Sequence, residues 1–205
     1  MSCNPAFPEE GNKLLAVVMC GGKSMRMGTD KGLMKVGDST WVQEAVAKLE
    51  AEGLPVVISI NEAQQVEYGK LFDPEMLIID SVEIPGPLCG LFSVHAKYPT
   101  CDLMIMACDL PDIQADMIMD LYTIYDNKAG EHDFMVYSNQ GALEPLFGVY
   151  TAEGISKIYL LFLTGQLERF SMKHALEIAN TYSVELKEEQ RAQLRNYNAH
   201  EDLKK

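Results

Sequence analysis

Four short apolar runs lie in the first half of the chain, and polar or turn residues follow each of them. Both faces of each run are apolar, which is typical of parallel strands that helices cover on both sides. We therefore predict strands at Leu14–Cys20, Val56–Ile60, Met76–Ile79 and Leu103–Cys108.

Helical patterns fill the intervals between these strands. Thr40 is a candidate N-cap for "WVQEAVAKLEAE", and Gly53 ends that segment. "LCGLFSVHAKY" precedes the fourth strand, and "ADMIMDLYTIYD" follows Asp112, another candidate cap. Strand and helix thus alternate through about the first 125 residues, which predicts a three-layer, doubly wound α/β fold with a mostly parallel sheet.

The second part of the chain has a less regular pattern. Two strands at Phe134–Ser138 and Pro145–Tyr150 flank a glycine-containing turn, so we expect a hairpin or a return to the sheet edge. Helices are expected at Ile155–Leu163 and Ser171–Ala179, and the charged stretch Glu185–Arg195 is interpreted as a solvated helix face. No proline- or glycine-rich linker divides the two parts. We expect one domain over residues 1–205, with residues 1–12 as a candidate disordered start.

Composition limits the class of protein. Apolar residues make up 47% of the 205 residues, and the formal net charge is -13. Such acidity argues against binding nucleic acid or an anionic membrane through bulk charge. The first residues lack a signal-peptide pattern, and no run of 18 apolar residues occurs.

The cysteines are odd in number and lack C-x-x-C spacing, which favours reduced thiols in a cytoplasmic protein. We expect Cys20 and Cys108 to be buried.

The loop after the first strand contains the clearest candidate chemistry. It carries the cations Lys23, Arg26 and Lys31, and Gly22 and Gly28 are spaced along it. In open α/β sheets, ligands bind beyond the carboxyl ends of the strands. The spacing fits neither G-x-G-x-x-G nor the Walker A loop. Two interpretations stay open: a loop that wraps a triphosphate, or a surface loop with ordinary lysines.

Asp109 also follows an apolar strand. A carboxylate in this position needs compensation, which a Mg²⁺ ion would provide. Magnesium usually takes one or two protein carboxylates and completes its shell with water and phosphate oxygens, so one aspartate is chemically sufficient. The other interpretation is that Asp109 caps a helix, since "DLPD" also resembles a helix start.

The segment "MCGGKSMRMGTDKGLMKVGDSTWVQEAVAKL" resembles the L-A-G-G-x-S-x-R-M-G-x-D-K-x-L-L signature of small nucleotidyltransferases. The nearest branch is the molybdenum cofactor guanylyltransferases, the MobA family. Met19 and Cys20 replace the usual Leu-Ala, and their backbone can still serve. The agreement covers Gly21, Gly22, Ser24, Arg26, Met27, Gly28, Asp30 and Lys31.

The resemblance continues along most of the chain, from about Leu14 to Leu203. "ISIN" matches the second strand with its nucleotide-contacting Asn, and "IIDSVEIPGPLCGL" matches an Asp followed by G-P-L-x-G. "MACDLP" matches C-D-x-P, with an Asp at the metal position. "LEPLFGVY" resembles a substrate-side strand, and "NYNAHEDL" resembles N-x-N-T-P-E-D-L, although Ala-His replaces Thr-Pro. For the acceptor, the family's basic residue corresponds to Arg169 or Lys173, and spacing does not settle which.

The resemblance implies a fold of the nucleotide-diphospho-sugar transferase type and transfer of GMP from GTP to molybdenum-bound molybdopterin, with release of pyrophosphate and Mg²⁺ as cofactor. It implies catalytic roles for Arg26, Lys31 and Asp109, with Asp109 as the metal ligand. Cofactor-delivery proteins or apo-molybdoenzymes are the implied protein partners. The implied nucleotide and pterin contacts are Met19, Cys20, Gly21, Gly22, Gly28, Lys31, Asn61, Asp80, Gly86, Gly90, Asn196 and Asn198.

Alternatives remain for the function and for single residues. The chain could be a cytidylyltransferase of the same or a related phosphorylated acceptor, or a non-catalytic protein that binds a nucleotide or cofactor. Asn61 could be a helix cap, Gly86 and Gly90 could serve turn geometry, and the two asparagines near the C-terminus could form a polar turn.

Overall fold

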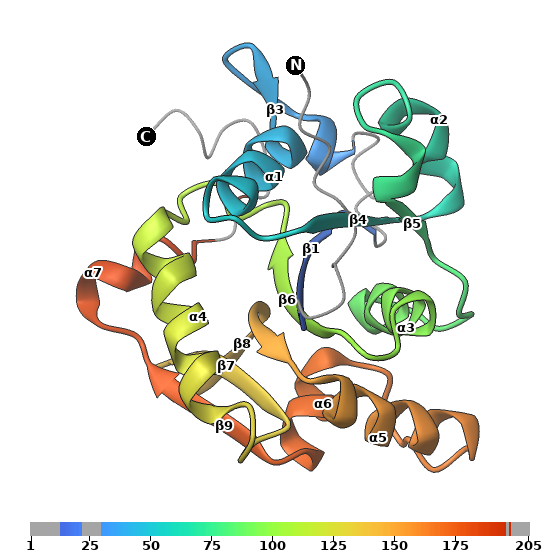
Figure 1. Cartoon of the computed structure of the whole chain (residues 1–205), viewed down its shortest axis with the longest axis vertical. Helices are drawn as coiled ribbons and strands as arrows, with labels where there is room; N and C mark the ends of the chain where they lie inside the picture. The colour runs from blue at the N-terminus through green and yellow to red at the C-terminus, as the bar shows by residue number, and fades with distance from the viewer. Residues whose placement is uncertain (1–12, 22–29, 196, 198–205) are drawn as a thin grey trace.

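A computed structural model describes residues 13–21, 30–195 and 197, and its main sheet has seven strands in the order β5-β4-β1-β6-β8-β7-β9 (Figure 1). A small antiparallel pair, β2 and β3, lies apart from that sheet. The strands are β1 (Leu14–Met19), β2 (Lys35–Val36), β3 (Ser39–Thr40), β4 (Val56–Ile60), β5 (Leu77–Ile79), β6 (Asp102–Ala107), β7 (Phe134–Asn139), β8 (Ala142–Tyr150) and β9 (Thr181–Glu185).

The main sheet is mostly parallel, as the sequence predicts. Strands β5, β4, β1 and β6 run parallel to one another, with β1 at the centre of this group. Strand β8 runs antiparallel to both neighbours, and β7 pairs in parallel with β9. The predicted hairpin is confirmed as β7 and β8, with Gly141 at a φ of 79° in its turn.

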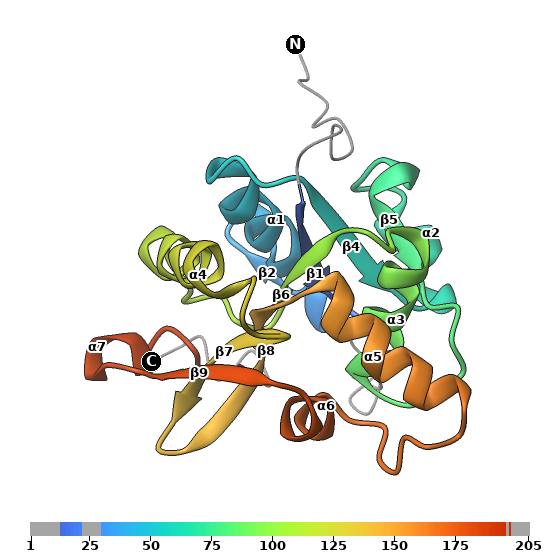
Figure 2. The ribbon, with the colours of Figure 1, turned by 60° about the horizontal axis from the view of Figure 1, so that its bottom comes forward.

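Helices cover both faces of the sheet, which confirms the three-layer prediction (Figures 1 and 2). Alternate residues of β1 point to opposite faces: Val18 packs in the core beneath α1 and α4, and Val17 packs in the core beneath α3, α5 and α6. The longer helices are α1 (Trp41–Ala51), α3 (Pro87–Lys97), α4 (Ala115–Lys128), α5 (Ala152–Leu163) and α6 (Met172–Ile178). The short ones are η2 (Lys31–Leu33), η3 (Glu62–Gln64), α2 (Gln65–Tyr68), η4 (Pro74–Met76) and α7 (Glu188–Arg191).

Local signals fix several boundaries. Thr40 caps α1 as expected: its hydroxyl accepts the N–H of Gln43, whose side chain accepts the N–H of Thr40. Gly53, with a φ of 76°, follows the end of that helix. The predicted cap at Asp112 is wrong, because α4 begins later and Gln114 occupies its N-cap position.

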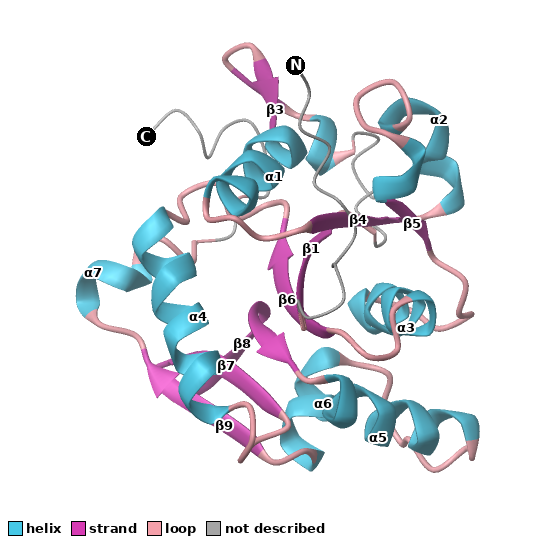
Figure 3. Ribbon diagram, viewed as in Figure 1, coloured by secondary structure: helices cyan, strands magenta, loops and turns pink. Residues whose placement is uncertain are grey.

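The prediction for Glu185–Arg195 is also corrected. Glu185 ends strand β9, and α7 covers only Glu188–Arg191. Strand β9 was not expected, because its pattern is half-exposed and lies at the sheet edge, where apolar periodicity is weak. Figure 3 shows this outer strand beside the β7–β8 hairpin.

The cysteines and the helix lengths agree with the expectations from composition. Cys20 and Cys108 are buried, and the four cysteines that the structure describes are free thiols. None of the helices in the described part of the chain is long and apolar enough to cross a membrane. The interpretation of residues 1–12 lies outside the described residues.

Candidate active site at the carboxyl edge of the sheet

The carboxyl ends of the four parallel strands bring the predicted polar residues to one edge of the sheet. Gly21 follows β1, Asn61 follows β4, Asp80 follows β5 and Asp109 follows β6 shortly after its end. Parallel strands in the order β5-β4-β1-β6 place all four at the same edge. This is the position where open α/β sheets bind their ligands.

Lys31 and Asp109 form an ion pair at this edge. Lys31 Nζ donates to Asp109 Oδ2 at 2.8 Å. The exposed fractions of the two side chains are 20% for Lys31 and 19% for Asp109. Lys31 begins η2, whereas Asp109 is 78 residues away in sequence. The capping interpretation of Asp109 is therefore wrong: the next helix starts at Ala115 with a different cap, and the carboxylate faces a cation.

The neighbouring Asp30 has a different role. Its Oδ1 accepts the N–H of Gly32 at 2.9 Å and the hydroxyl of Tyr68 at 3.1 Å. Its Oδ2 accepts from Gln64 Nε2 at 2.6 Å. Gly32 has no room for a side chain, because a Cβ would lie 2.1 Å from the Tyr68 hydroxyl. These three donors hold the carboxylate of Asp30 and fix the start of η2, and with it the backbone of Lys31.

Asp80 lies against the backbone of Gly21. A Cβ on Gly21 would lie 3.0 Å from Asp80 Oδ2, so a side chain at position 21 would require Asp80 to shift by a few tenths of an ångström. Ser59 Oγ donates to Asp80 Oδ1 at 3.2 Å. Burial raises the pKa of Asp80 above its usual range, and hydrogen bonds from Ser59 and Cys89 partly oppose that shift. The sequence did not single out Ser59, because it lies inside an apolar strand.

The two predicted glycines around α3 differ in their constraints. Gly86 is exposed, occupies the N-cap of α3 and has a φ of 83°, a conformation that favours glycine. Gly90 is buried, and a Cβ there would lie 2.3 Å from Ser59 Oγ and 2.7 Å from Met19 Cε. Packing of α3 on the sheet therefore accounts for Gly90 without a ligand.

The backbone groups of Met19 and Cys20 already take part in the sheet edge. The Met19 carbonyl accepts the N–H of Cys108 at 3.2 Å, and the Cys20 carbonyl accepts from Gln64 at 3.0 Å. Both side chains are buried in the core. Asn61 starts η3, where its N–H donates to Gln64 Oε1 at 2.9 Å. Nucleotide contacts by these three residues stay predictions.

Five predicted site residues lie outside the described residues: Gly22, Arg26, Gly28, Asn196 and Asn198. Tyr197, between the two asparagines in sequence, is described. Its N–H donates to the Asp109 carbonyl at 3.2 Å, and its ring packs edge-on against Trp41 with centroids 6.3 Å apart. Tyr197 thus contacts the backbone of the candidate metal ligand.

On the acceptor side, the structure separates the two candidate cations. Arg169 precedes α6 and forms an ion pair with Glu177 of that helix at 2.6 Å. Its guanidinium also donates to His174, another residue of α6. Lys173 instead lies close enough to Glu144 of β8 to oppose the rise in pKa that burial causes in that carboxyl. The two cations therefore have different acidic neighbours, Glu177 for Arg169 and Glu144 for Lys173.

The donor set fits magnesium that arrives with a nucleotide. Within the described ranges, no cluster of three or more His, Cys, Asp or Glu side chains is arranged to hold a metal on its own. One half-buried carboxylate, Asp109, faces the edge where a phosphate would lie. Mg²⁺ retains several waters and shares phosphate oxygens, so this small donor set suffices.

A family model described as the MobA-like NTP transferase domain matches residues 16–177. This chain belongs to the MobA-like NTP transferase family. The match spans β1 through α6 and so includes every described site residue named above except Tyr197. The resemblance seen in the sequence motifs is thereby confirmed, together with the fold that it implies.

Relatives of this family member carry consistent names. The chain is 23% identical over 189 residues to a probable molybdenum cofactor guanylyltransferase of Methanothermobacter thermautotrophicus, covering 91% of this chain and 95% of the relative. It is 28% identical to one from Clostridium perfringens, with coverages of 84% and 91%. Molybdopterin-guanine dinucleotide biosynthesis protein A from Archaeoglobus fulgidus shares the fold, with a TM-score of 0.72, 20% identity and coverages of 93% and 95%.

Proposed function

We propose that this protein is a Mg²⁺-dependent guanylyltransferase that transfers GMP from GTP to molybdenum-bound molybdopterin. The observation that carries the proposal is the pairing of Lys31 with Asp109 at the carboxyl edge of a MobA-like domain. A cation for phosphate and a carboxylate for a metal face each other there. Relatives named molybdenum cofactor guanylyltransferase support the substrate pair.

Each described residue has a part that follows from its chemistry. Asp109 would hold Mg²⁺, which when bound supplies positive charge to the triphosphate. Lys31 would neutralise phosphate oxygens as charge develops during displacement at the α-phosphorus. The terminal phosphate of the pterin is already an anion at neutral pH, so no general base is required. Positioning and charge neutralisation would supply the rate.

Asp80 supports guanine as the base. A carboxylate accepts hydrogen bonds and donates none when ionised. The Watson–Crick edge of guanine offers N1–H and N2–H₂ donors, whereas that edge of cytosine presents mainly acceptors beside one amino group. Asp80 beside Gly21 is thus better suited to guanine, which favours GTP over the cytidylyl alternative.

The test is pyrophosphate release from GTP, CTP, ATP and UTP, with and without the pterin acceptor. We expect release with GTP, only when the acceptor and Mg²⁺ are present. Asp109→Ala should lower turnover by at least 100-fold, whereas Asp126→Ala, an exposed carboxylate on α4, should not change it. Equal release with CTP would refute the guanylyl assignment, and full activity of Asp109→Ala would refute the metal role.

The acceptor side can be tested with the matched pair of cations. We assign the acceptor contact to Lys173, whose ammonium group lies near Glu144 of β8, so Lys173→Ala should raise the KM for the pterin about tenfold. Arg169→Ala, whose guanidinium is engaged by Glu177, should leave that KM within about twofold. The reverse order of effects would assign the acceptor to Arg169 instead.

A further inference from the structure

The side chain of Gln64 connects three separate segments of the candidate site. Its Nε2 donates to the Cys20 carbonyl at 3.0 Å and to Asp30 Oδ2 at 2.6 Å. Its Oε1 accepts the N–H of Asn61 at 2.9 Å. These partners lie at the end of β1, at the start of η2 and at the end of β4. The half-buried side-chain amide of Gln64 therefore connects the ends of β1 and β4 to the turn that carries Lys31.

An ordinary capping role explains only part of this arrangement. Gln64 and Asn61 are three residues apart at the start of η3, and their contact is the usual one for a helix start. The two contacts of Nε2 reach across 44 and 34 residues of sequence and add nothing to η3 itself. They hold the β1 end and Asp30 at a fixed spacing.

The consequence for Lys31 follows from the next link. Asp30 accepts the N–H of Gly32 and so fixes the first turn of η2, which begins with Lys31. Lys31 in turn reaches Asp109 across the edge. Because an ionised carboxylate only accepts hydrogen bonds, Asp30 requires a donor from Gln64. An acceptor placed there would push Asp30 away and shift Lys31 with it.

We propose that Gln64 is a positioning residue of the transferase, which sets Lys31 in place through Asp30 and touches no reacting atom. The proposal rests on the proposed function for its kinetic readout. It adds a residue that the motif resemblance did not mark, since Gln64 lies outside every segment matched there.

The test exchanges donor for acceptor at constant size. Gln64→Glu replaces the Nε2 donor with an oxygen that faces Asp30 Oδ2 and the Cys20 carbonyl. We expect kcat to fall about 10- to 100-fold, because a like-charge contact replaces a charge-assisted hydrogen bond. The KM for the pterin should stay unchanged. Gln65→Glu adds the same charge at the adjacent exposed position and should leave kcat unchanged.

Rescue separates positioning from a general loss of structure. Asp30→Asn in the Gln64→Glu background supplies an amide donor at position 30 and a carboxylate acceptor at position 64. We expect this double variant to recover about tenfold in kcat over Gln64→Glu alone. Asp30→Asn alone should be impaired, because two amide donors then face each other. A double variant no better than Gln64→Glu, or wild-type kcat in Gln64→Glu, would overturn the proposal.

A second readout does not depend on turnover. Lys31 is only 20% exposed and ion-paired, so amine-reactive labelling followed by mass spectrometry should modify it slowly in the wild type. Gln64→Glu should speed labelling of Lys31 severalfold relative to exposed Lys35. An unchanged Lys31 rate would overturn the proposal even if kcat falls. If the wild type transfers no nucleotide, the proposed function fails, while this labelling still decides the role of Gln64.

Discussion

The ion pair between Lys31 and Asp109 leads to a prediction about metal binding before any nucleotide is present. The ammonium group of Lys31 occupies an oxygen of the carboxylate that the proposed Mg²⁺ needs. Under the proposed function, metal and lysine would therefore compete for Asp109 in the nucleotide-free protein. A bound triphosphate would remove the competition, because it offers Lys31 a phosphate partner. Lys31→Met should accordingly raise the affinity for a divalent cation without nucleotide and lower the affinity for the nucleotide.

The size of the effect follows from the geometry of the pair. Fully exposed ion pairs are worth about 0.2–1 kcal/mol, and hydrogen bonds to charged groups about 1.5–3 kcal/mol. With Nζ 2.8 Å from Oδ2 and both side chains about one-fifth exposed, the pair belongs near the upper of these two classes. A competition of about 1.4–2.8 kcal/mol corresponds to a Kd about 10- to 100-fold lower for the metal in Lys31→Met.

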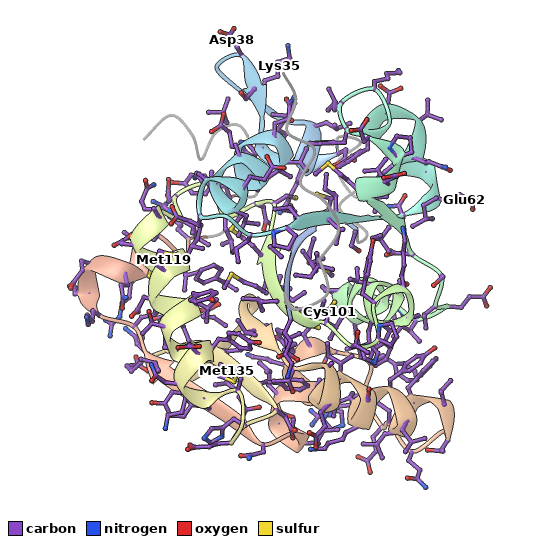
Figure 4. The ribbon with its side chains drawn as sticks, viewed as in Figure 1. Lys35, Asp38, Glu62, Cys101, Met119 and Met135 are labelled. Atoms are coloured by element: carbon purple, nitrogen blue, oxygen red, sulfur yellow. The ribbon has the colours of Figure 1, made fainter. Side chains whose placement is uncertain are left out.

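The assay is a Mn²⁺ titration followed by the electron paramagnetic resonance signal of free Mn²⁺, without nucleotide. Lys35→Met is the matched control, since it removes the same charge from an exposed position on the β2–β3 hairpin; Figure 4 shows Lys35 and Asp38 at its outer end. Asp109→Asn added to Lys31→Met should abolish the gain. Equal Mn²⁺ affinity in the wild type and Lys31→Met, or the same gain in Lys35→Met, would refute competition at Asp109.

Three further predictions concern packing, pH and base selection. Gly90→Ala should lower the free energy of unfolding by about 1–2 kcal/mol in chemical denaturation, because its methyl group meets Ser59 Oγ; adding Ser59→Ala should recover part of the loss. Burial lowers the pKa of His95, so the unfolded chain takes up a proton below about pH 6.5 before the folded one does. Stability is thus lost as pH falls from there toward the folded pKa, and the Tm of the wild type should drop more between pH 7 and 5 than that of His95→Asn. Asp80→Asn should lower the ratio of the Kd for CTP to the Kd for GTP by about tenfold. An unchanged ratio would show that Asp80 does not contribute to base recognition.

The fold was largely predictable because its signal is local. A strand buried on both faces must be apolar along its length, and β1, β4, β5 and β6 all show this pattern. The predicted starts and ends differ from the observed ones by at most one residue. Strand β9 and the β2–β3 pair were missed for the opposite reason. Their residues are partly exposed, and β2 and β3 have only two residues each, so apolar periodicity is weak in both. Strand β9 also pairs with β7, which is distant in sequence.

The site was predictable only where residue type and place in the sheet coincide. Asp80 and Asp109 follow apolar strands, and a parallel sheet necessarily brings such residues to one edge. Gln64 and Tyr68 could not be found in this way, because they lie on short helices and act through side-chain hydrogen bonds to Asp30. The spacing of Asn61 and Gln64 indicates a helix start, but it gives no sign of the contacts that Gln64 makes beyond it.

Asp30 and Asp109 show why residue type alone does not separate a structural carboxylate from a proposed metal ligand. Asp30 accepts from a backbone N–H, a buried phenol and an amide, none of which can leave without disturbing the fold. The donor described for the side chain of Asp109 is an ammonium group on a long, flexible side chain. Only the second kind of partner can be exchanged for a cation at low cost. The same loop therefore ends in two adjacent residues with different tasks, because Asp30 holds the turn in place and Lys31 is left able to move from carboxylate to phosphate.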